Sequence, residues 1–225
     1  IISQILIIGS SLLRFPQFQQ AVERARFLFR LSSLLDSNDT LIIQRIAHFL
    51  AAAATSDALR RQILVSGAIA FLLVTSSNCT FDAQLLLDVL SLLERMETTN
   101  EYCVYLANEG VFDFIQSCLT IQSEDASLFT QALRCYRGFT QNSWICRERV
   151  LSASTLEILF ILIEKQYESP AAVTALCSFL TLVSEYEVGL ESLRSLYCVE
   201  VLKRLADVYP DSTEERKSID AAIAA

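Results

Sequence analysis

The sequence predicts an all-α fold, a right-handed α-solenoid, on three observations. A pattern of about 43 residues recurs along the chain, which is the period expected of stacked helical repeats. Only 5 Gly and 3 Pro occur among 225 residues, so few positions can break a helix. Within each recurrence, apolar residues fall at i, i+3, i+4 and i+7, which is the spacing of one face of an amphipathic helix.

The recurrence is carried by apolar positions that repeat at nearly constant spacing. The first of three sets is spaced by 42, 43, 44 and 43 residues. The three sets are Phe27, Ile69, Phe112, Leu156 and Val199; Ile46, Val89, Leu133 and Leu176; and Phe49, Leu92, Tyr136 and Phe179. We expect the members of each set to occupy the same place in successive repeats, because one repeat cannot bury its apolar face without its neighbours.

Polar breaks between the apolar phrases predict where helices begin and end. Asp, Ser and Asn recur at these breaks and suit helix N-caps, and Pro170 suits a first helical turn. Gly67 and Gly110 fall where a short helix must turn sharply into the next unit. Ser212 and Glu215 have capping-box spacing before the last helix. Each unit is therefore predicted to hold a short, a medium and a long helix.

This period and helix order resemble the armadillo repeat, whose signature phrase is similar to Ser66–Ile69 and Glu109–Phe112. HEAT repeats have a similar period, but the Gly at the unit junction favours the armadillo pattern. The resemblance implies one repeat domain, 1–225, with about four full units and partial units at both ends. The units are 1–24 (partial), 25–66, 67–109, 110–152, 153–195 and 196–225 (partial or capping). Because the sequence begins with Ile1 rather than Met, we expect a fragment of a longer protein.

Composition and charge exclude several classes of function. The net charge is −8, with +3 on residues 1–66 and −11 on the remainder, which argues against nucleic-acid binding. No apolar run approaches the ~20 residues of a membrane span, so no membrane insertion is expected. Seven dispersed cysteines without a CxxC pair indicate reduced, buried thiols. These features favour a cytoplasmic protein, with the nucleus as the alternative.

No catalytic or metal-binding pattern is present in the sequence. His48 is the single histidine and has no Cys, Asp or Glu at i+3 or i+4, whereas a zinc site needs several converging ligands. Glycine-rich phosphate-binding motifs are absent from the sequence. We therefore predict a protein that is not an enzyme and that uses no cofactor and no metal.

The resemblance implies that the long third helices line a concave groove that binds a partner. In armadillo import receptors these helices carry a Trp and, four residues on, an Asn. The corresponding columns here are His48, Ser91, Cys135 and Ser178, and Ala52, Arg95, Phe139 and Leu182. The ladder is absent, so binding of nuclear-localisation signals does not carry over. The predicted groove residues are Gln44, Arg45, His48, Asp88, Ser91, Arg95, Gln131, Cys135, Phe139, Ser178 and Leu182.

Three functions fit these features. The first is a protein–protein interaction scaffold that binds a helical or extended partner segment in the groove, where Phe139 and Leu182, if exposed, would accept an apolar anchor. The alternative for these two residues is that they belong to the core and that the alignment is off by one. The second function is a regulator of a nucleotide-driven machine, such as a chaperone exchange factor or a GTPase effector. The third is self-association through the terminal repeats. Trp144, near the start of a short helix, is expected to pack between repeats, with a hot spot for partner binding as the alternative.

Overall fold

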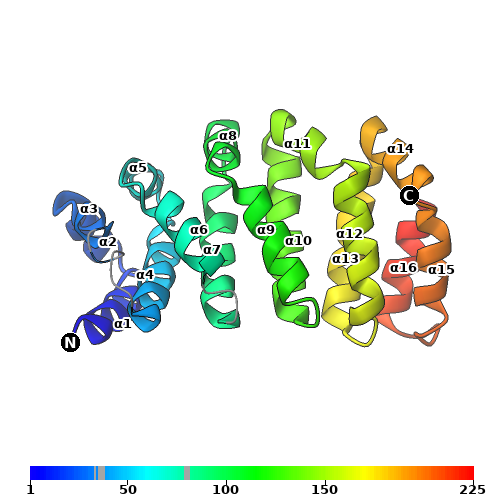
Figure 1. The fold of residues 1–225 in the computed structure, drawn as a ribbon, viewed down its shortest axis with the longest axis horizontal. Helices are drawn as coiled ribbons and strands as arrows, with labels where there is room; N and C mark the ends of the chain where they lie inside the picture. The colour runs from blue at the N-terminus through cyan, green and yellow to red at the C-terminus, as the bar shows by residue number, and fades with distance from the viewer. Residues whose placement is uncertain (33, 35–38, 79–81) are drawn as a thin grey trace. The chain divides into compact units, whose positions relative to one another are not determined.

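A computed structural model describes residues 1–32, 34, 39–78 and 82–225. These residues form sixteen helices and contain no strand, which confirms the predicted all-α class (Figure 1). Cys79 and part of the polar breaks before residues 40 and 82 fall outside the described ranges.

The helices follow one another in triplets, in each of which the third helix is the longest. A single helix, α1 (Ile2–Leu12), precedes them. The triplets are α2 (Pro16–Arg24), α3 (Phe27–Ser32) and α4 (Thr40–Ala53); α5 (Asp57–Val65), α6 (Ala68–Asn78) and α7 (Ala83–Met96); α8 (Asn100–Asn108), α9 (Val111–Ile121) and α10 (Ala126–Asn142); α11 (Trp144–Val150), α12 (Ala153–Gln166) and α13 (Pro170–Ser184); and α14 (Glu187–Ser195), α15 (Cys198–Ala206) and α16 (Glu214–Ala224).

The chain divides into two compact units, which we call unit 1 and unit 2. Unit 1 comprises Ile1–Thr98 and Tyr105–Ile121, and unit 2 comprises Thr99–Val104 and Gln122–Ala225. In unit 1 the third helix α4 packs between α1 and α7, and in unit 2 the third helix α13 packs between α10 and α16. The apolar core of each unit therefore lies between successive third helices and the shorter helices that cover them.

Side-chain caps begin the third helices as the polar breaks predict. Asp39 accepts hydrogen bonds from two backbone N–H groups at the start of α4, and Asp125 does the same for α10. Asp82 caps α7 and Ser169 caps α13, where Pro170 occupies the first turn. These contacts satisfy N–H groups that have no partner within the helix, so the helix starts are encoded locally.

The two junction glycines adopt the backbone conformation that the sequence indicates. Gly67 has φ +72° and Gly110 has φ +87°, both in the left-handed region that side chains with a Cβ rarely adopt. Each glycine lies between the first and second helix of its triplet, so the sharp turn expected after the short helix is confirmed.

The predicted register of the second helices holds from Ile69 to Val199 and is off by one at Phe27. Ile69, Phe112 and Leu156 are buried as expected. Val199 is 40% exposed, but it follows Tyr197, which has positive φ, by two residues, as Ile69 follows Gly67, so it keeps the predicted place. Phe27, in contrast, is only half-buried, while the residue after it is fully buried. Where two adjacent residues of a helix are both hydrophobic, tertiary packing decides which of them is buried.

None of the described helices is by itself long and apolar enough to cross a membrane. One bent pair of helices, Asp57–Val65 with Ala68–Ser77, reaches the necessary length and hydropathy only when the two are combined.

Candidate functional site

The buried positions of the third helices fix their true alignment, and α10 is shifted by one residue from the prediction. Ile46, Val89, Ala132 and Leu176 are equivalent, because the residues around each are buried in the same order. The sequence comparison chose Leu133 in place of Ala132, since a large apolar residue resembles its counterparts better than a small one. Leu133 is also buried, but it matches the second buried column.

This shift removes two predicted residues from the candidate binding face. Cys135 and Phe139 are both 0% exposed, so placing them on an open groove is wrong. The alternative reading of Phe139 as a core residue in a misaligned helix is the correct one. Leu182 is 8% exposed and Gln131 is 9% exposed, so neither presents a substantial side-chain surface. The residue that α10 presents in the column of Ser178 is Arg134, which is exposed.

The predicted residues of unit 1 lie on the neighbouring helices α4 and α7. His48 is exposed, and its Nδ1 lies 3.2 Å from Oδ1 of the buried Asp88 on the next third helix. Ser91 is half-buried and Arg95 is exposed on the same face of α7. The backbone carbonyl of Arg95 accepts a hydrogen bond of 3.0 Å from Nε of Arg60. The remaining two predicted residues, Gln44 and Arg45, are half-buried on α4. Their role in binding a partner stays a prediction.

Unit 2 holds a groove between its third helices, lined by both polar and apolar residues, which we call the α13 groove. It consists of two hollows of about 450 Å³ and about 400 Å³ that share Arg137, Thr174 and Ser178. Helix α13 forms the floor, and α10 and α16 form the walls. On the floor, Ala171, Thr174, Ala175, Ser178 and Thr181 are small, and Pro170, Cys177, Phe179 and Leu182 lie beside them; the walls carry Arg134, Arg137 and Gln141 on α10, and Glu215, Ser218 and Ala221 on α16. Small floor side chains leave room for a partner chain.

Arg137 is the central groove residue that the sequence analysis missed. Its Nη1 donates a hydrogen bond of 3.1 Å to Oγ of Ser178. Nη1 of Arg134, one turn earlier, lies 3.4 Å from Oε1 of Gln131. The sequence does contain a signal for this face, because Arg134 and Arg137 are three residues apart and therefore lie on one face of α10. The misaligned register assigned that face to the core instead.

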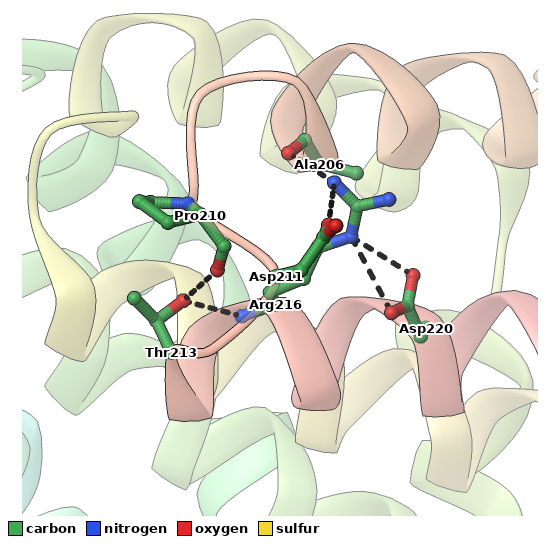
Figure 2. Close-up of polar contacts among 6 residues, drawn as sticks. All are labelled: Ala206, Pro210, Asp211, Thr213, Arg216 and Asp220. Carbon is green, nitrogen blue, oxygen red and sulfur yellow. Dashed lines mark hydrogen bonds and ion pairs between the residues drawn. The ribbon is translucent and has the colours of Figure 1, made fainter.

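Arg216 holds the α16 wall in place from the side of α15 (Figure 2). Its Nη1 donates a hydrogen bond of 2.7 Å to the carbonyl oxygen of Ala206, at the end of α15. Its Nε lies 3.2 and 3.3 Å from the two carboxylate oxygens of Asp220, and Asp211 lies 3.5 Å from Nη1. One guanidinium therefore ties α16 to the preceding helix and loop, and so positions the wall residues of the groove.

The cap of α16 differs by one residue from the predicted capping box. Thr213, not Ser212, accepts a hydrogen bond of 3.2 Å from the backbone N–H of Arg216. The hydroxyl of Thr213 also donates to the carbonyl oxygen of Pro210 at 2.9 Å, as Figure 2 shows. A Thr hydroxyl caps as well as a Ser hydroxyl, so the geometry of the loop decided between the two.

Two exposed apolar features lie outside the groove. Unit 1 has a hollow of about 410 Å³ between α1 and α2, lined by apolar residues that include Ile5, Ile8 and Phe18. This hollow lies in the first repeat. Self-association through the terminal repeats, the third function that fits the sequence, stays a prediction. Trp144, at the start of α11, is 66% exposed, so the prediction that it packs between neighbouring repeats is wrong.

The chemistry available to the described residues is limited. Within the described ranges, no three His, Cys, Asp or Glu side chains gather to hold a metal ion. Burial raises the pKa of Cys118 from 9.0 to about 12 and that of Cys198 to about 11. Burial and the neighbouring Cys198 raise the pKa of Cys177 to about 12. These thiols are therefore protonated at neutral pH and poorly nucleophilic.

The raised thiol pKa values predict that the folded protein loses stability in alkaline solution. The unfolded chain releases these protons near pH 9, whereas the folded chain retains them to about pH 11–12. Stability is thus full below pH 9 and falls as the pH rises towards 12, by about 1 kcal/mol per thiol between pH 9 and 10. Urea unfolding at pH 8, 9 and 10 measures this slope. Cys118→Ala is expected to have a shallower slope, and an unchanged slope would contradict this assignment.

Comparisons with known proteins identify the fold and no close relative. Neither a protein-family model nor a curated protein matches the sequence. Among solved structures, an engineered protein matches with a TM-score of 0.82 and 17% identity, over 99% of this chain and 90% of that one.

Designed armadillo repeat proteins are also among the similar structures. One, from a set designed for modular peptide recognition, matches with a TM-score of 0.78 and 16% identity, over 99% of this chain and 90% of that one. Another was solved in complex with the peptide (KR)4, and matches with a TM-score of 0.75 and 16% identity, over 98% and 91% of the two chains. The chain therefore has the armadillo-repeat fold, which confirms the predicted α-solenoid.

Proposed function

We propose that this chain is a non-enzymatic interaction module that binds a peptide segment of a partner protein in the α13 groove. The observation that carries the proposal is the pair of joined hollows along α13, with a floor of small side chains and polar walls. Such a groove admits a main chain close to the floor and leaves the walls to contact the partner's side chains. The designed armadillo structure in complex with a peptide supports this use of the fold.

The floor and the walls have separate parts in this proposal. Ala171 and Ala175 leave space above α13, and the hydroxyls of Thr174 and Ser178 offer hydrogen bonds there. The walls carry long charged side chains that can reach over a bound segment. Arg137 spans both hollows and is held in position by Ser178. An exposed side chain that is already oriented loses less conformational entropy when it binds.

Filling the floor of the groove tests the proposal. A random 12-residue peptide library is selected against the wild-type protein, and the enriched peptides are measured by fluorescence anisotropy. Thr174→Trp places a large ring where the two hollows meet. We expect it to weaken the enriched peptides at least about tenfold, equivalent to about 1.4 kcal/mol. Thr174 is exposed, so the fold should persist, which circular dichroism checks.

Glu157→Trp is the matched control, because Glu157 is exposed on α12 and lines neither hollow. It adds the same ring elsewhere on unit 2 and should leave peptide affinity unchanged. Selection that yields no peptide sensitive to Thr174→Trp would refute binding in this groove.

A further inference from the structure

The α13 groove carries charges that lack a partner within the protein. Arg134 and Arg137 stand on its α10 wall, and neither makes an ion pair with a carboxylate in the described part of the chain. Glu215 on α16 borders the first hollow and Glu185, at the C-terminal end of α13, borders the second; among described residues, neither has a basic partner. The groove therefore carries positive charge on the α10 wall and negative charge at Glu215 on α16 and at Glu185 at the end of α13.

The two cations that follow Glu215 in the sequence are already engaged elsewhere. Arg216 binds Asp211 and Asp220 on the α15 side of α16. Lys217 lies 2.6 Å from Glu214, one turn apart on α16. Neither cation therefore neutralises Glu215, which directly precedes them in the sequence and lines the first hollow.

Arg137 has the geometry of an anion-binding side chain. A guanidinium has five N–H donors, and only one, on Nη1, is used by Ser178. Arg137 lines both hollows. A planar carboxylate satisfies two such donors at once, which neither a hydroxyl nor an amide oxygen does as well. The neighbouring Arg134 adds a second positive charge on the same wall.

From this arrangement we infer that the partner segment bears an Asp or Glu that binds Arg137, and a Lys or Arg near Glu215 or Glu185. The inference rests on the proposed function and specifies the ligand of the same groove. It also separates this chain from the designed armadillo protein that holds (KR)4. A uniformly basic peptide would place positive charge against Arg134 and Arg137 and is disfavoured on that wall.

Coupling between a peptide carboxylate and Arg137 provides the test. In peptides enriched from the 12-residue library, each Asp or Glu is replaced by Asn or Gln and measured on wild type and on Arg137→Gln. We expect one acidic position whose neutralisation weakens wild-type binding about tenfold and has little further effect on Arg137→Gln. Glu215→Gln should be coupled in the same way to one basic position.

The controls separate this inference from the proposed function. Arg194→Gln removes an exposed arginine that lines neither hollow, and it should show no coupling to the acidic position. Peptides that are displaced by Thr174→Trp but have no acidic position coupled to Arg137 would overturn the inference and leave groove binding intact. If no peptide responds to Thr174→Trp, both the proposed function and this inference fail.

Discussion

Replacing Phe139 with alanine is expected to lower the free energy of unfolding by about 3–5 kcal/mol, the range for truncation of a buried phenylalanine. The ring is 0% exposed on α10, so its removal leaves a cavity that the surrounding helices fill only in part. Urea or thermal unfolding followed by circular dichroism measures the loss. A partner-contacting residue would instead show lost binding with unchanged stability.

Arg134→Ala is the matched control, because Arg134 lies on the same helix as Phe139 but on its exposed face. Arg134 is exposed and lines the groove, so its removal should change stability by no more than about 0.5 kcal/mol. If Phe139→Ala is as stable as wild type and Arg134→Ala is less stable, the alignment predicted from the sequence is correct instead.

Gly189→Ala is expected to destabilise the protein by about 2 kcal/mol, within the range of core overpacking. Gly189 is buried in α14, and an added Cβ would overlap the carbonyl oxygen of Val183 on α13. The same Cβ would lie 2.8 Å from Cγ1 of Val183. The backbone of α13 cannot rotate away as a side chain can, so α14 must shift. Chemical denaturation measures the change.

Gly9→Ala adds the same methyl group at another buried glycine and serves as its control. There the added Cβ would lie 2.8 Å from Cε2 of Phe49, at the outer part of a side chain. A ring can turn aside, and alanine favours the helix over glycine by about 1 kcal/mol. We therefore expect a smaller loss than at Gly189. Equal stability of Gly189→Ala and wild type would contradict the described packing of α14 on α13.

Local chemistry explains why most of the fold could be predicted from the sequence. Helix starts at Asp125 and Ser169 depend on side chains that bond to nearby backbone N–H groups. The turns at Gly67 and Gly110 need positive φ, which glycine tolerates best. The period of about 43 residues follows from apolar positions along the chain. Each of these signals lies within a few residues of the structure that it specifies.

The groove could not be predicted in the same way, because its lining depends on the rotation of α10 about its own axis. That rotation decides which of two adjacent residues is buried. In α10 the small Ala132 and Cys135 are equivalent to larger core residues elsewhere, so hydrophobic matching selected Leu133 and displaced the exposed face by one residue. The sequence by itself determined the helices, the caps of α4, α7, α10 and α13, and the repeat. Only the tertiary structure decided that Phe139 is core and that Arg137 lies in the groove, because packing against α13 sets the rotation of α10.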